Sequence, residues 1–123
     1  MALQHVVLFS FPSDPTAEQD ADIRRYIAEW PDAIPGIRAL RFGDALFTER
    51  TRNYQYLLYM EFDSVDDLRS YQGHPVHQKF LSWVNDSGIT PLAFDYHLDA
   101  DTVLVPARGG ATSPRSDDGA TNR

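Results

Sequence analysis

The N-terminal part of the chain carries a hydrophobic run at residues 2–11, ALQHVVLFSF. Its content of Val, Leu and Phe predicts a β-strand. In an extended strand, His5 and Val7 lie on one face, whereas Val6 and Leu8 lie on the other. Because both faces are largely apolar, we expect the strand to be covered on both sides, with His5 inside an apolar row.

A helical pattern follows this strand. The spacing i, i+3, i+4, i+7 predicts one apolar helix face made of Ile23, Tyr26, Ile27 and Trp30. Two starts of the helix fit the sequence. Asp14 can act as the N-cap before Pro15, or Thr16 and Gln19 can form a capping box. Pro31 closes the pattern, because proline interrupts a helix.

The rest of the chain alternates between strand and helix patterns. Residues 36–46 and 54–62 alternate as strands, and a last strand follows Pro91. Two helices are predicted between the second of these strands and the last. The first follows Ser64, a favoured N-cap residue, and ends at Gly73, since glycine favours a helix C-terminus. The second begins at Pro75, because proline is favoured in the first turn.

This order, β-α-β-β-α-β, predicts an α+β, ferredoxin-like fold with an antiparallel sheet covered by helices on one face. The other sheet face then carries Val6, Leu8, Leu57 and Tyr59. Because an exposed apolar patch of this kind is typical of an interface, we expect a homodimer that packs sheet against sheet, a dimeric α+β barrel.

Composition limits the possible partners. The 123 residues suffice for one domain, expected at 1–105, while residues 106–123 lack large hydrophobic side chains and predict a disordered tail. The net charge of −7 argues against nucleic acid and anionic membranes as partners. No cysteine is present, which excludes thiol chemistry. The N-terminus lacks the features of a signal peptide, so we expect a cytoplasmic protein.

The segment SYQGHPVHQKF, residues 70–80, carries the candidate chemistry. Read locally, it is a helix start with a structural histidine. In the predicted fold, however, His77 and Tyr71 meet His5 between the sheet and the helices, with Tyr56 and Leu58 on a neighbouring strand. Imidazoles and phenols in an apolar cavity form a set suited to proton transfer.

The stretches HVVLFSF, HPVHQKF and FDYHL resemble the stress-responsive dimeric α/β-barrel family, called Dabb, over about residues 2–99. The family includes polyketide cyclases and stress proteins. At the level of the fold it also resembles cofactor-free monooxygenases, haem-degrading enzymes and a hydroxynitrile lyase. Similarity to its plant polyketide cyclases implies catalytic roles for His5, Tyr71 and His77. It also implies that Tyr56 replaces a pocket histidine. The implied apolar pocket consists of Val7, Phe9, Ile23 and Ile27, with Leu58 beside them.

The first hypothesis is therefore a cofactor-independent cyclase or lyase acting on a polyketide-like or phenolic substrate. The alternatives are a non-catalytic stress or ligand-binding barrel and a cofactor-free monooxygenase. We expect no metal, because His74 precedes Pro75 and falls outside the helix that carries His77. The sequence leaves open whether Asp95 orients His77 or only forms a hydrogen bond at the end of its strand.

Overall fold

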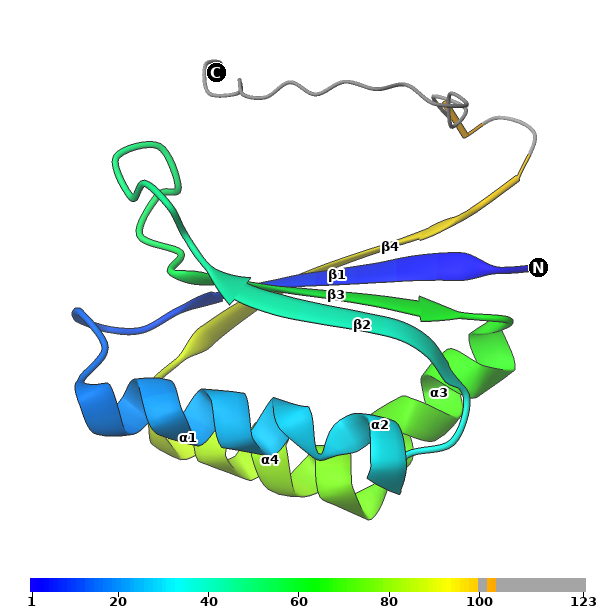
Figure 1. Cartoon of the computed structure of the whole chain (residues 1–123), viewed down its shortest axis with the longest axis horizontal. Helices are drawn as coiled ribbons and strands as arrows, with labels where there is room; N and C mark the ends of the chain where they lie inside the picture. The colour runs from blue at the N-terminus through cyan, green and yellow to red at the C-terminus, as the bar shows by residue number, and fades with distance from the viewer. Residues whose placement is uncertain (100–101, 104–123) are drawn as a thin grey trace, which may run out of the picture.

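The computed structural model describes residues 1–99, 102 and 103 (Figure 1). Its elements are β1 (Leu3–Ser10), α1 (Ala17–Ala28), α2 (Trp30–Ala33), β2 (Ile37–Asp44), β3 (Tyr56–Phe62), α3 (Val65–Gly73), α4 (Pro75–Asp86) and β4 (Thr90–His97). They confirm the predicted order, with each helical part divided in two. The tail predicted at 106–123 and the end of the predicted domain at 104–105 lie outside the described residues.

The four strands form one antiparallel sheet in the order β2-β3-β1-β4. Both helical connections cross the same face, so all helices lie on one side of the sheet, as Figure 1 shows. The α+β, ferredoxin-like fold predicted from the sequence is thus confirmed. Strand β1 is central and pairs with β3 on one side and β4 on the other, which places His5 opposite both Met60 and Asp95.

Local sequence decides where α1 begins. The side chain of Thr16 accepts a hydrogen bond from the backbone of Gln19 at 3.0 Å, and the Gln19 side chain accepts from the backbone of Thr16 at 2.9 Å. This reciprocal capping box satisfies two backbone N–H groups at the helix start. Of the two predicted starts, the structure therefore has the capping box, and Asp14 and Pro15 precede the helix.

The core lies between the sheet and the helices. Burial alternates strictly along β1 and β3. In the single chain only their helix-facing rows are buried, whereas the sequence predicted cover on both sides of β1. These rows pack against the apolar faces of α1, α3 and α4 to form the buried cluster: Leu3, Val7, Phe9, Phe11, Ile23, Ile27, Trp30, Ile34, Tyr56, Leu58, Met60, Phe62, Leu68, Tyr71, Phe80, Val84 and Ile89.

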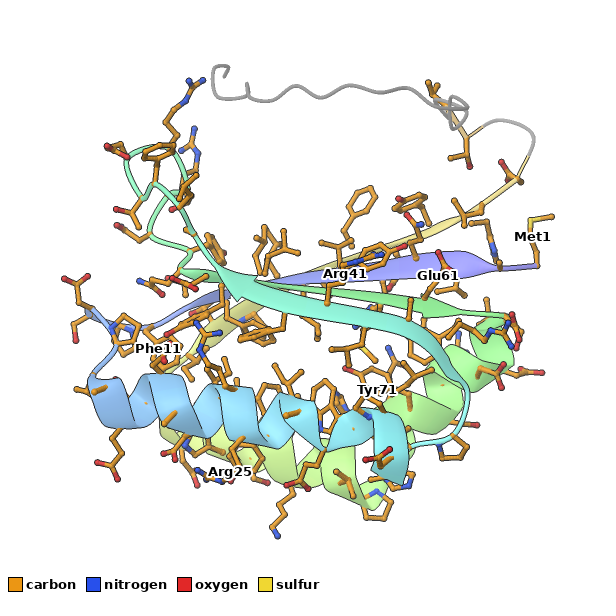
Figure 2. All side chains as sticks on the ribbon, viewed as in Figure 1. Met1, Phe11, Arg25, Arg41, Glu61 and Tyr71 are labelled. Atoms are coloured by element: carbon orange, nitrogen blue, oxygen red, sulfur yellow. The ribbon has the colours of Figure 1, made fainter. Side chains whose placement is uncertain are left out.

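The outer sheet face is apolar over a wider area than the sequence predicted. Leu57 is 43% exposed, as expected for that face, but β4 adds a second exposed row made of Leu92, Phe94 and Tyr96. Tyr59 lies on the same face, opposite Val6, and its hydroxyl donates to Glu61 at 2.9 Å. Figure 2 shows Arg41 and Glu61 on the side away from the helices, whereas Tyr71 points into the interior. No helix of the described residues is long and apolar enough to cross a membrane.

Candidate active site

The site is built on the break between α3 and α4. His74 is extended, with φ −66° and ψ 138°, as a residue before proline prefers. Its Nδ1 accepts a hydrogen bond from the backbone of Val76 at 3.1 Å and so caps α4. Pro75 has no N–H group, so carbonyl groups at the end of α3 need other donors.

His77 supplies one of these donors. Its Nδ1 lies 3.1 Å from the carbonyl oxygen of Gln72, to which the Gln78 side chain also donates at 2.6 Å. Because a carbonyl only accepts hydrogen bonds, Nδ1 of His77 carries the proton. In the neutral imidazole, Nε2 is then the free acceptor, which is the form that a general base requires.

Tyr71 joins the two histidines. The centre of its ring lies 4.2 Å from that of His77 and 5.6 Å from that of His5. All three side chains are buried, with exposures of 1% for Tyr71, 5% for His5 and 7% for His77. The structure therefore brings together the three residues that the sequence singled out, on β1, α3 and α4.

Asp95 is the partner of His5. Its Oδ1 atom accepts a hydrogen bond from Nδ1 of His5, across the β1–β4 pair in which the two residues stand opposite each other. An ionised carboxylate accepts only, so it fixes the His5 tautomer with Nε2 free. The sequence left open whether Asp95 orients His77 or forms a hydrogen bond at the end of its strand. In the structure the carboxylate does not contact His77 and is hydrogen-bonded to His5.

Burial sets the protonation states around this cluster. It lowers the pKa of His77, an effect opposed by the hydrogen bond to Gln72 and reinforced by His5 and His74. Burial, with a smaller contribution from the negative charge of Asp95, raises the pKa of the Tyr71 phenol. At neutral pH the arrangement thus combines a neutral imidazole, able to take a proton, with a protonated phenol, able to donate a hydrogen bond.

The implied pocket residues are part of the packed core. All six are buried in the cluster between sheet and helices: Val7, Phe9, Ile23, Ile27, Tyr56 and Leu58. Among these six, Tyr56 also lines a groove of about 880 Å³. Its other lining residues are Leu8, Leu57 and Leu92 of the outer face and residues 41–47, 50–52, 54 and 55. None of His5, Tyr71 and His77 lines this groove. A substrate pocket at the three residues therefore stays a prediction.

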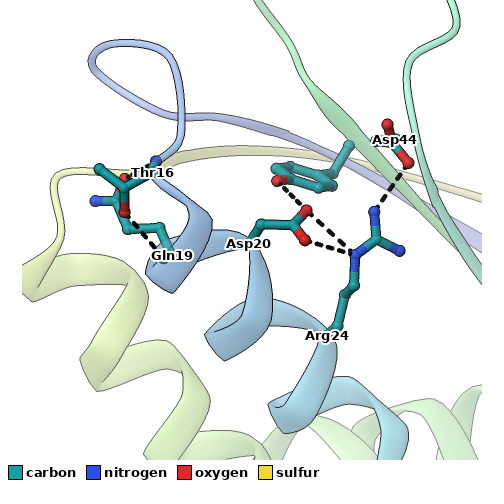
Figure 3. A network of polar contacts seen from close by, with 6 residues as sticks. Thr16, Gln19, Asp20, Arg24 and Asp44 are labelled. Carbon is teal, nitrogen blue, oxygen red and sulfur yellow. Dashed lines mark hydrogen bonds and ion pairs between the residues drawn. The ribbon is translucent and has the colours of Figure 1, made fainter.

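Tyr56 belongs to a separate polar network (Figure 3). Its hydroxyl donates to Asp20 at 2.7 Å, and Nε of Arg24 donates to both oxygens of that carboxylate at 3.1 Å. The guanidinium group of Arg24 also donates a hydrogen bond to Asp44 at 2.8 Å. Burial, followed by the hydrogen bond to Asp20, raises the pKa of Tyr56. Because Tyr56 pairs with Phe9, four positions along β1 from His5, this network lies at the other end of the core.

Trp30 is a neighbour of the site that the sequence placed only in the core. Its indole ring lies 5.4 Å from the His77 ring and 5.5 Å from the Tyr71 ring, measured between centres. For Asp95 the sequence likewise indicates only orientation of His77 or a hydrogen bond at the end of its strand. The signal that identifies its role is the register of β1 and β4. Among the described residues, no group of three or more acidic, histidine or cysteine side chains is arranged to hold a metal ion.

Residues 3–98 match the model of the Dabb family, described as the stress responsive A/B barrel domain. The chain belongs to this family. The match covers every helix and strand, including the three clustered residues and Asp95. The resemblance inferred from HVVLFSF, HPVHQKF and FDYHL is thus confirmed.

The chain is similar to three known proteins that carry different descriptions. Olivetolic acid cyclase from Cannabis sativa is 24% identical over 97 residues, which are 78% of this chain and 96% of that protein. A dimeric ferredoxin-like protein of unknown function from Thermobifida fusca is 26% identical with a TM-score of 0.69, covering 80% of this chain and 92% of its own. Hydroxynitrile lyase from Passiflora edulis is 15% identical with a TM-score of 0.72, covering 83% and 97%. The last supports the fold alone.

Proposed function

We propose that this Dabb protein is a cofactor-independent cyclase or lyase acting on a polyketide-like or phenolic substrate. The observation that carries the proposal is the contact of Tyr71 with His77 and His5, both of which use Nδ1 in another hydrogen bond. Two imidazoles with free Nε2 atoms and one phenol then face a single buried region. The likeness to olivetolic acid cyclase supports a polyketide-like substrate.

In the proposed reaction, Nε2 of His77 removes a proton from the carbon between two carbonyl groups. The Tyr71 hydroxyl donates a hydrogen bond to the enolate oxygen that develops. The enolate carbon attacks a second carbonyl carbon of the same substrate chain, and a C–C bond forms. The resulting alkoxide takes up the proton that His77 removed, which Nε2 of His5 first accepts and then donates. Each positioned acid or base contributes about 10²–10⁴-fold to such a step. Water-excluding surroundings strengthen these hydrogen bonds.

In this proposal the protein acts as a homodimer. Leu57, Leu92 and Phe94 are exposed on the outer sheet face, where a second copy can cover them. Burying such side chains is favourable by about 25 cal/mol per Å² of apolar surface. The relative from Thermobifida fusca is named as dimeric, which supports the same association here.

A second candidate is a non-catalytic barrel that binds an apolar ligand. The observation that favours it is the groove of about 880 Å³, which is separate from the three clustered residues. In this case a ligand would occupy the outer groove, and His77 would serve mainly as a hydrogen-bond donor to the carbonyl group of Gln72 at the end of α3.

Turnover of a linear poly-β-ketone by the purified chain separates the two candidates. The cyclase proposal expects a cyclic product from the wild type and a loss of about 10²–10⁴-fold in kcat/KM for His77→Asn. Asparagine keeps an N–H group that can reach Gln72 but has no base. Equal turnover by both proteins, with both folded by circular dichroism, would contradict the proposal. No turnover by the wild type, together with binding of an apolar ligand that is lost on substitution of Leu92 in the groove, would favour the second candidate.

A further inference from the structure

Trp30 contains the one polar side-chain atom in the described part of the chain that is fully buried and has no hydrogen-bond partner. The residue is 0% exposed, and its indole Nε1 finds no acceptor among the described residues. An indole N–H group is a donor only. Since buried polar groups in folded proteins are nearly always paired, an unpaired one in the core calls for a specific explanation.

The position of Trp30 is determined by the local sequence. It is the first residue of α2, directly before Pro31, and α1 ends two residues earlier at Ala28. Proline lacks an N–H group and interrupts the helix, so the chain bends here. The bend directs the indole inward, where its ring makes edge-to-face contacts with Tyr71, His77 and Phe80.

The ring lies against two of the three clustered residues. Centre-to-centre distances are 5.4 Å to His77 and 5.5 Å to Tyr71. Nδ1 of His77 already donates to Gln72 and therefore does not accept from the indole. The cluster thus combines a free imidazole acceptor, a phenol and an unpaired donor within one buried region.

We infer that the indole N–H group of Trp30 is a binding donor for an oxygen atom of the ligand in the Tyr71–His77 region. This rests on the proposed function and makes it more specific: the ligand presents a carbonyl, carboxylate or phenolate oxygen beside the atom that His77 deprotonates. A hydrogen bond from Trp30 to a carbonyl oxygen withdraws electron density and acidifies the adjacent C–H. The same donor discriminates against hydrocarbons of equal size, which leave it unpaired.

Indole NMR tests this directly, because the chain has two tryptophans. Trp83 is the internal control: it is partly buried and contacts Phe11, Tyr26 and Phe80 rather than the site. The probes are 2,4-dihydroxy-6-methylbenzoic acid, which offers oxygen acceptors, and toluene, which offers none. We expect the acid to move the Trp30 N–H signal downfield and slow its exchange with water, while toluene and the Trp83 signal show neither effect.

The substitution Trp30→Phe supplies the second measurement, with Trp83→Phe as the matched control. Phenylalanine keeps an aromatic ring and removes the donor. We expect the affinity for the acid to fall about tenfold in Trp30→Phe, with the affinity for toluene unchanged, and no loss for the acid in Trp83→Phe. If Trp30→Phe does not fold, the wild-type signals alone decide.

Three results would overturn the inference. These are an unmoved Trp30 signal at millimolar acid, the same shift with toluene, or equal affinity of Trp30→Phe and the wild type for the acid. Failure of the proposed function looks different: the acid binds and moves the Trp30 signal, but no poly-β-ketone is cyclised.

Discussion

Nδ1 of His77 donates a hydrogen bond to the carbonyl oxygen of Gln72 at 3.1 Å, across the break between α3 and α4. This contact joins the candidate base to the end of the preceding helix. The break at Pro75 creates the need for a donor, and the first turn of the next helix supplies it. Orientation of the imidazole therefore follows from the local fold and does not require a bound ligand.

The buried position of His77 makes stability depend on pH. Burial lowers its pKa in the folded state below the usual value of 6.5. As the pH falls below that value, the unfolded chain binds a proton that the folded chain does not, so the free energy of unfolding falls with it. We expect the stability of the wild type relative to His77→Asn to decrease between pH 7.5 and the lower, folded-state pKa. Urea unfolding at several pH values measures this difference.

A constant difference between these two proteins over that range would show that His77 titrates alike in both states. The comparison with His77→Asn is needed because carboxylates also titrate in acid. Subtracting the variant removes their contribution, since its acidic residues are the same.

Asp95 is expected to stabilise the fold through His5. In Asp95→Ala the Nδ1 atom of a residue that is only 5% exposed loses its acceptor. The Asp95 side chain is 40% exposed, so water can replace part of the interaction. We expect a loss of about 1 kcal/mol in the free energy of unfolding, below the full cost of an unpaired buried group. Asp63→Ala is the control, because its contact with Arg38, at 3.6 Å, is exposed on both sides.

The ¹⁵N spectrum of His5 reports which ring nitrogen carries the proton. A general loss of packing would not change it. With Asp95 present, Nδ1 carries the proton; in Asp95→Ala we expect a mixture of tautomers. An unchanged spectrum together with unchanged stability would mean that the carboxylate does not hold the ring in solution.

Several features of this molecule are readable from sequence because they depend on neighbours along the chain. The alternation in residues 2–11 predicts which side chains of β1 share a face, and the Thr16–Gln19 pair is one of the two helix starts that the sequence offers for α1. The proline in HPVH predicts the helix start and places His74 outside the helix. Each of these follows from backbone geometry over at most a few residues.

Other features depend on which segments become neighbours in space. The partner of Asp95 follows from the pairing of β1 with β4, and alternation within one strand does not reveal that register. The same register explains why the outer row of β4, with Phe94 opposite Val6, extends the apolar face. The unpaired indole of Trp30 depends on every group around it, so the helical spacing predicts only that the residue is buried.

Tyr56 and Asp20 are expected to be energetically coupled. Their hydrogen bond of 2.7 Å joins β3 to α1, and the tyrosine is buried. A double-mutant cycle with Tyr56→Phe and Asp20→Asn should give a coupling of about 0.5–1 kcal/mol in unfolding free energy. The matched cycle pairs Tyr56→Phe with Asp22→Asn, whose partner is Arg25. That control should be additive within about 0.3–0.5 kcal/mol, and equal coupling in both cycles would contradict a specific contact.

The proposed dimer gives the most direct test of the outer sheet face. Leu57→Asp places a charge in the middle of this face, beside Leu8, its partner on β1. Because a buried unpaired carboxylate is costly, we expect the variant to be monomeric by light scattering at micromolar concentration, whereas the wild type is dimeric. The matched control is Leu81→Asp: Leu81 is 36% exposed, close to the 43% of Leu57, but lies on α4 on the opposite side of the molecule. A wild type that is monomeric, or a Leu57→Asp variant that stays dimeric, would contradict association through this face. Dissociation of the dimer by Leu81→Asp would assign the interface to the helices.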